Sequence, residues 1–263
     1  MRRGLELWAG ETGRELELVD DGSDPAAAAA VHAELLASGC SPVLGPYGSD
    51  TTRAVAVDRA GGVVWNHGAA ADDVQRLPGV VSVPTPASRY LVALARAAAG
   101  LGATRVAVLA APGRFPRLAR EGLEREAPAL GVELVAEAEA DAVLLCGPVE
   151  WEAARFAELA RPGVILGGVS PGLPSAPRAW PDGTLAPVQW HPDLGGPAGL
   201  PDYVAAQTYA AAEIAVRCVT AQAAHDLAAE TFFGRFELDE TGLQVGHRLA
   251  VVRDGQLLLA DAA

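Results

Sequence analysis

The chain has 263 residues, of which 50% are hydrophobic, and its 20 basic and 33 acidic residues give a formal net charge of −13. A chain of this length can bury a large core, as one domain or as two lobes. Its acidity opposes binding to a phosphate backbone, so nucleic acid is not expected as a partner. No apolar run is long enough and free enough of charge to cross a bilayer. The composition therefore predicts a soluble globular protein.

The first residues lack the pattern of a secretion signal. They read Met1-Arg2-Arg3-Gly4-Leu5, and neither an apolar core nor a small-residue cleavage site follows. As written, the chain is expected in the cytoplasm. A start codon further upstream would instead be consistent with export.

Strands and helices are expected to alternate from residue 15 onward. The segment 15–20 alternates acidic and apolar residues, whereas Val143-Leu144-Leu145 is apolar throughout, as a strand covered on both faces should be. Strands are expected near 15–20, 42–45, 63–66, 80–84, 105–109, 132–136, 141–146, 163–167 and 185–190, with a mixed tail near 231–238 and 246–260. Helices are expected near 25–38, 50–60, 87–101, 116–129, 150–160 and 202–220. This order predicts an α/β fold with mainly parallel, doubly wound sheets.

One junction between a strand and a helix has the character of an anion site. The segment 41–52 reads SPVLGPYGSDTT, which predicts a buried strand, a glycine loop and a helix capped by Ser49. The start of a helix presents unpaired N–H groups and the positive end of its dipole. A hydroxyl at this position can bind a carboxylate, although serine is also a common cap without any ligand.

The sequence contains no motif for a metal or a cofactor. Cys40, Cys146 and Cys218 are widely spaced, with no C-x-x-C pair and no histidine at zinc spacing. We expect free thiols, and the spacing alone does not exclude one disulfide. No glycine-rich nucleotide motif follows a strand, so no cofactor is expected.

A serine hydrolase is the one enzymatic alternative with a motif. Gly168-Val169-Ser170-Pro171-Gly172 matches the G-x-S-x-G nucleophile elbow. The residue after the nucleophile must donate its N–H to the oxyanion, and proline has none. The chemistry therefore fails at Pro171.

Several further segments follow an order known from one protein family. They are VVWNHGAA at 63–70, VSVPTP at 81–86, VAVL at 106–109, PDYVAAQTYAA at 201–211 and FGRFELDETG at 233–242. With the junction at 41–52, this succession resembles the type I periplasmic-binding-protein fold. Within that fold it is similar to the leucine-binding-like proteins of ABC transporters, which bind branched-chain amino acids and amides. The resemblance covers nearly the whole chain.

The resemblance implies two Rossmann-like lobes joined by a hinge that the chain crosses three times. Lobe one would comprise 1–84 and 191–246, and lobe two 85–190 and 247–263. The ligand would sit between them at the carboxyl ends of the strands, and the lobes would close on it. A first strand-loop unit of the family has no match here. Either the true start lies upstream, or this relative is shorter and leaves a strand edge exposed.

The resemblance also implies contacts with a ligand. Ser49 matches the serine that receives the ligand carboxylate, and Ala69 matches a backbone contact in the next loop. Ala70 stands where the family usually has a hydroxyl residue. Phe115 stands where the family has an aromatic wall. The family's acidic partner for an ammonium group is missing near Val169, which leaves Glu150 as the candidate. Tyr47 and His67 complete the predicted site, although a half-buried Tyr or His is more often structural.

These observations predict a non-catalytic protein that binds a small, carboxylate-bearing solute. An ABC permease would be its partner, with no cofactor and no membrane span. Two alternatives with the same fold remain: a cytoplasmic ligand sensor or regulatory subunit, and a degenerate relative that serves only as a protein-interaction module.

Overall fold

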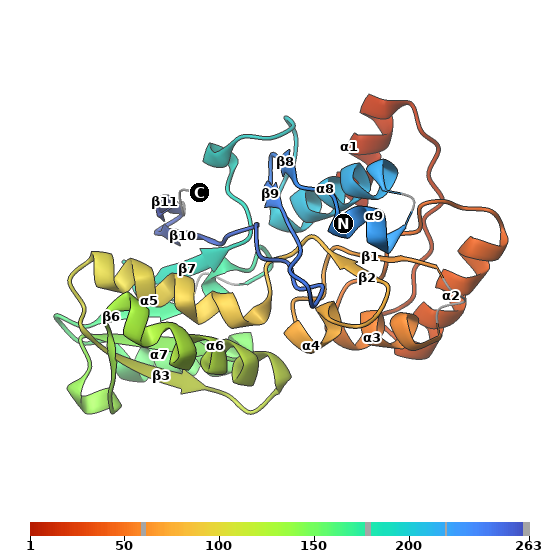
Figure 1. The fold of residues 1–263 in the computed structure, drawn as a ribbon. Helices are drawn as coiled ribbons and strands as arrows, with labels where there is room; N and C mark the ends of the chain where they lie inside the picture. Colours follow the sequence, from red (N-terminus) through yellow and green to blue (C-terminus); the bar gives the residue numbers. More distant parts are fainter. Residues whose placement is uncertain (59–61, 177–179, 219, 260–263) are drawn as a thin grey trace. The chain divides into compact units, whose positions relative to one another are not determined.

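The computed structural model describes residues 1–58, 62–176, 180–218 and 220–259. The chain forms two compact units, and each contains two stretches of sequence (Figure 1). Unit 1 comprises Met1–Pro86 and Leu194–His247, and unit 2 comprises Ala87–Asp193 and Arg248–Ala263. The last residues predicted for the helix at 50–60 and for the strand tail at 246–260 lie outside the described residues, as do parts of both predicted lobes.

Unit 1 is built around a small parallel sheet. Its elements are α1 (Arg2–Thr12), α2 (Pro25–Ala37), α3 (Ser49–Asp58), β1 (Val64–Asn66), α4 (Asp72–Gln75), β2 (Val80–Ser82), α8 (Tyr203–Arg217), α9 (Ala221–His225), β8 (Ala229–Thr231) and β9 (Gly234–Phe236). Strands β1 and β2 pair in parallel, with Trp65 opposite Val81. Leu44 adds an isolated parallel bridge to Trp65, and β8 and β9 form a separate antiparallel pair.

Helices cover both faces of this small sheet. Helices α8 and α9 lie on one side of β1 and β2, and α3 and α4 lie on the other (Figure 1). Helix α1 packs against α8 so closely that a Cβ on Gly4 would lie 2.1 Å from the Ala205 carbonyl oxygen. The Tyr209 hydroxyl donates to Glu11 at 2.5 Å and joins the same two helices. Unit 1 is therefore a three-layer α/β/α arrangement.

Unit 2 contains a larger, mixed sheet. Its elements are η1 (Ala87–Arg89), α5 (Tyr90–Gly100), β3 (Arg105–Ala110), α6 (Arg114–Leu130), β4 (Glu133–Leu134), η2 (Glu137–Glu139), β5 (Ala142–Cys146), α7 (Val149–Leu159), β6 (Ile165–Gly168), η3 (Ser170–Gly172), β7 (Leu185–Val188), η4 (Pro192–Leu194, which ends in unit 1), β10 (Ala250–Arg253) and β11 (Gln256–Leu259). The strand order is β11-β10-β7-β6-β5-β3-β4. The pairs from β4 to β7 are parallel, and β10 pairs antiparallel with both of its neighbours.

Strand β5 illustrates why this sheet is covered on both faces. Leu144 packs in the core formed with α5 and α6, whereas Val143 and Leu145 pack in the core that contains Phe156 of α7. Successive side chains of a strand point to opposite faces. An unbroken apolar run therefore fills two cores at once, as the sequence predicts.

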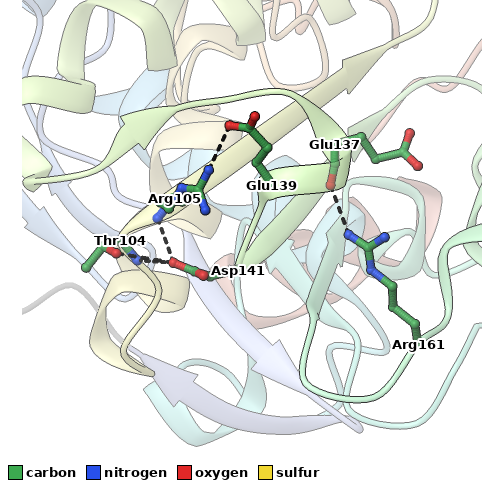
Figure 2. A network of polar contacts seen from close by, with 6 residues as sticks. All are labelled: Thr104, Arg105, Glu137, Glu139, Asp141 and Arg161. Carbon is green, nitrogen blue, oxygen red and sulfur yellow. Dashed lines mark hydrogen bonds and ion pairs between the residues drawn. The ribbon is translucent and has the colours of Figure 1, made fainter.

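A polar network fixes the amino ends of the strands in unit 2 (Figure 2). The Asp141 carboxylate accepts hydrogen bonds from the Thr104 N–H at 3.0 Å and the Arg105 N–H at 2.9 Å. These two backbone hydrogen bonds lower the pKa of Asp141, and the bond from Thr104 has the larger effect. Arg105 pairs with Glu139 at 2.7 Å. The network ties β3 to the segment that enters β5.

The predicted fold class is confirmed, but some predicted strands are wrong. Residues 15–20 form no strand, and only Leu44 of 42–45 makes a bridge. The strand predicted at 132–136 shrinks to Glu133–Leu134, because it pairs with β3 over only two residues. A strand needs a hydrogen-bonded neighbour, and an alternating sequence does not guarantee one.

We expect Gly122→Ala to destabilise unit 2 by about 1 to 3 kcal/mol. Gly122 lies in α6, and an added Cβ would lie 2.0 Å from the Ser88 carbonyl oxygen. Backbone cannot move aside as a side chain can. Gly100→Ala, at the end of α5, is the matched control, because a Cβ there meets nothing within 4 Å. Chemical denaturation of both variants checks this, and equal stabilities would contradict it.

Candidate ligand site

The loop before α3 is held by two threonine hydroxyls. Thr51 Oγ1 donates to the Tyr47 carbonyl at 2.9 Å, and Thr52 Oγ1 donates to the Pro46 carbonyl at 3.3 Å. Gly48 turns the chain with φ 108°, which is a conformation that favours glycine. Its carbonyl accepts from the Thr52 N–H at 3.1 Å. These bonds position the first turn of the ten-residue helix α3.

Ser49 is the first residue of α3 and does not cap it from outside as the sequence suggested. The Gly48 carbonyl accepts the first helical hydrogen bond, so the helix begins one residue earlier than predicted. Ser49 Oγ accepts from the Ala71 N–H at 3.3 Å. Since this bond uses only a lone pair, the hydroxyl proton of Ser49 remains able to donate.

Asn66 organises the neighbouring loop, and the sequence analysis did not single it out. Its Oδ1 accepts from the Gly68 N–H at 3.1 Å and the Ala69 N–H at 2.7 Å. Its Nδ2 donates to the Ala69 carbonyl at 2.8 Å. The Ala69 N–H is therefore occupied, whereas the Ala70 N–H has no hydrogen-bond partner in the described part of the chain. An asparagine at the end of a buried strand was the available signal.

Tyr47 and His67 lie close together beside this loop. Their ring centroids are 6.3 Å apart, and the Tyr47 ring lies over Gly68, where an added Cβ would be 2.3 Å from it. Tyr47 is 40% exposed, but His67 is only 4% exposed. His67 Nε2 contacts Met1 Sδ at 3.1 Å, and burial lowers the pKa of His67 to about 4. His67 is therefore neutral near pH 7.

Two other histidines of unit 1 are buried. His32 and His247 are 4% and 2% exposed, and burial lowers the pKa of both. His247 Nδ1 bonds the Val83 carbonyl at 2.5 Å and packs on Phe233. His225 is exposed.

Unit 2 carries the other two residues predicted for the site. Phe115, in the first turn of α6, packs edge-on against Tyr90 with ring centroids 5.0 Å apart. Glu150 is an exposed residue in the first turn of α7. Phe115 thus contributes to the core of unit 2, and Glu150 has the exposure that a ligand contact requires. Their predicted contacts with a ligand stay predictions.

Glu152 is a buried carboxylate that the sequence analysis missed. It is 0% exposed, and its oxygens accept from the Gly147 N–H at 2.8 Å and the Ser170 N–H at 2.9 Å. Burial raises the pKa of Glu152 to about 7, partly opposed by these two bonds. The side chain therefore links the loops that follow β5 and β6. Its helical spacing from Phe156, another core residue, was the only sequence signal.

The serine of the G-x-S-x-G motif serves the same junction. Ser170 is 1% exposed, and its hydroxyl donates to the Gly147 carbonyl at 3.2 Å. Pro171 follows it in η3. This serine is enclosed and lacks the neighbouring N–H that an oxyanion hole requires.

Cys40, Cys146 and Cys218 are free thiols. Over the described residues, no cluster of three or more His, Cys, Asp or Glu side chains could hold a metal ion. None of the helices within the described ranges has the length and apolar character needed to span a membrane.

Comparison with known proteins identifies the family of this chain. The family model described as "Periplasmic binding protein" matches residues 1–143, which is more than half of the chain. The chain belongs to the periplasmic-binding-protein family. The predicted family and fold are thereby confirmed, whereas none of the curated proteins that were compared matches the chain.

Solved structures of this fold resemble the family member described here. A solute-binding protein of an ABC transporter from Rhodopseudomonas palustris HaA2, in complex with p-hydroxybenzoic acid, has 18% identity and TM-score 0.75, over 97% of this chain and 89% of that one. A leucine-binding protein from Thermotoga maritima MSB8 has 17% identity and TM-score 0.74, over 97% and 91%. A substrate-binding protein from Desulfitobacterium hafniense, in complex with Leu, has 19% identity and TM-score 0.76, over 97% and 94%.

Proposed function

We propose that this protein is the solute-binding component of an ABC transporter and binds a small molecule through its carboxylate. The start of α3 carries the proposal. Ser49 presents a hydroxyl proton there, and the Ala70 N–H lies one residue before the Ala71 N–H that bonds Ser49 Oγ. Two donors beside the positive end of a helix dipole favour a carboxylate.

The rest of the ligand is proposed to be apolar or neutral. Val169 is 7% exposed and lies where the resemblance implies an acidic partner for an ammonium group. A ligand ammonium without a partner would cost several kcal/mol to bury. One of the similar solved structures holds p-hydroxybenzoic acid, which has a carboxylate and no ammonium group. Another holds Leu, which has both groups. Of the residues predicted for the site, only Glu150 carries a negative charge to pair with an ammonium group.

We also infer that the protein is not an enzyme. The nucleophile position of the one G-x-S-x-G motif is Ser170, which is enclosed and hydrogen-bonded to Gly147. An ABC permease is the proposed partner, because the similar solved structures include solute-binding proteins of ABC transporters.

A ligand panel tests the proposed function. We expect benzoate and 4-hydroxybenzoate to raise the melting temperature, since a ligand at 100 times its Kd stabilises by about 2.7 kcal/mol. Benzamide and benzyl alcohol are the matched controls, because they keep the ring and lack the carboxylate. If no carboxylate stabilises the protein, the proposal is wrong. Leucine binding at low micromolar Kd, about −8 kcal/mol, would instead assign the ammonium to Glu150.

A further inference from the structure

A pocket of about 430 Å³ lies within unit 2, at the amino ends of β6 and β7. Among the described residues, these two strands pair only where Gly167 stands opposite Leu185. The segments 160–166 and 181–184 come before the paired residues, and both contribute to the lining of the pocket. A ligand of an open α/β sheet usually binds at the carboxyl ends of the strands. This pocket lies at the opposite end, so it is a separate candidate site.

The turn that enters β7 forms one wall of the pocket. The N–H and the Oγ1 of Thr184 both donate to the Pro181 carbonyl, at 3.2 Å and 2.6 Å. The Gly183 N–H donates to Asp254 Oδ1 at 2.7 Å, which ties the turn to the hairpin of β10 and β11. Gly183 has φ 81°, a conformation that favours glycine. These contacts hold the wall in place without any ligand.

Arg253 brings a guanidinium group to this wall. It is the last residue of β10 and lines the pocket. A Cβ on Gly183 would lie 3.0 Å from Arg253 Nη2, so the guanidinium group lies against the turn. It makes neither a hydrogen bond nor an ion pair with any other residue that the structure describes. All of its N–H donors are therefore available to a ligand.

Arg161 supplies a second guanidinium group to the pocket. Its Nη2 donates to the Glu137 carbonyl at 2.9 Å (Figure 2), whereas the Glu137 carboxylate pairs with Arg155 at 3.3 Å. Within the described ranges, Arg161 has no carboxylate partner. The one carboxylate in the described lining is Asp182, and it forms no ion pair with either arginine of the pocket. Two unpaired guanidinium groups thus face one carboxylate, in a protein of net charge −13.

Most of the remaining lining is apolar, and the pocket has the size of a small-molecule site. Ligand pockets measure roughly 300 to 1,000 Å³ and combine apolar walls with a few polar groups. Apolar surface of a ligand that is buried against these walls contributes to affinity. The apolar residues are Leu101, which follows α5, and Ala160, Val164, Ile165, Leu166 and Pro181.

We propose that this pocket binds a small organic dianion with an apolar body, either a phosphate monoester or a dicarboxylate. Two guanidinium groups match two negative charges, and the planar fork of each can bind two oxygens of a phosphate or a carboxylate. The apolar walls accept the body of the ligand. The site belongs to unit 2 alone, and it does not depend on the solute site proposed at the start of α3.

Calorimetric titration with phenyl phosphate and with phthalate tests the proposal and separates the two sources of negative charge. Phenyl phosphate is a dianion at pH 8, because its second pKa is about 6. Phenyl methyl phosphate is the matched monoanion, and inorganic phosphate is the dianion without an apolar body. We expect phenyl phosphate or phthalate to bind at least about tenfold more tightly than either control.

Two substitutions in the pocket should change this affinity in opposite directions. Arg253→Gln should weaken binding of the dianion by about five- to tenfold, since it removes a charge-assisted hydrogen bond. Asp182→Asn should tighten binding by about two- to fivefold, since it removes a like charge. A gain in affinity cannot result from misfolding. Arg117→Gln changes the net charge as Arg253→Gln does, but Arg117 lies in α6 and pairs with Glu121 at 2.8 Å, so it should have no effect.

Three results would overturn the proposal. The first is the absence of saturable binding of both dianions at millimolar concentration. The second is equal affinity of Arg253→Gln and Arg117→Gln for the dianion. The third is loss of the same binding in Ser49→Ala with Arg253→Gln unaffected, because the dianion would then bind at the start of α3. Benzoate separates the two sites, since it should bind Arg253→Gln as tightly as the wild type.

Discussion

Ser49→Ala should weaken binding of the stabilising carboxylate by about ten- to a hundred-fold. The substitution removes a charge-assisted hydrogen bond worth roughly 1.5 to 3 kcal/mol. It also removes the acceptor of the Ala71 N–H, which should cost about 0.5 to 1.5 kcal/mol of stability. Calorimetric titration and thermal unfolding of the same samples separate these two effects.

A second serine provides the control for this experiment. Ser38 lies in unit 1 after α2, is exposed, and donates to the Leu35 carbonyl at 2.9 Å. Ser38→Ala should leave the affinity unchanged. If Ser49→Ala lowers the melting temperature but binds the carboxylate as tightly as the wild type, Ser49 serves only the loop. The ligand role would then be refuted, even if the solute-binding function stands.

Unit 2 should lose stability as the pH rises from about 4.5 to 7, because Glu152 is buried. Burial raises the folded-state pKa of Glu152 from 4.5 to about 7, so over this range the folded protein binds a proton that the unfolded chain has released. The resulting stability is present below the unfolded pKa and is lost as the pH rises through the folded one. The upper bound is roughly 3 kcal/mol, at 1.36 kcal/mol for each pKa unit.

The opposite trend in unit 1 must be separated from this effect. The pKa values of His67 and His247 are lowered to about 4. Each histidine therefore adds stability as the pH rises from about 4 to 6.5. Hydrogen exchange of β5 and β6 against β1 and β2, at pH 5 and pH 8, resolves the two units. Glu152→Gln should abolish the loss in β5 and β6, and an unchanged loss would show that another group causes it.

The sequence alone predicted the elements whose signals are local. The run Val143-Leu144-Leu145 indicated a strand covered on both faces, and it forms β5. The glycine loop before Ser49 indicated the start of α3 to within one residue. Turn residues, caps and apolar runs act over a few neighbouring positions. The mainly parallel sheet could therefore be predicted without coordinates, and the family was predicted from the resemblance that the order of the motifs carries.

Only the tertiary structure decided burial and pairing. His32 and Glu152 read as ordinary helical residues, and both are enclosed by elements distant in sequence. Asn66 became the centre of its loop because Ala69 folds back onto it. Residues 15–20 have the alternation of a strand but form no backbone pairing with the other described residues. A strand needs backbone partners that no local pattern provides. Desolvation and sheet pairing are properties of contacts between distant segments, so the three-dimensional arrangement decides them.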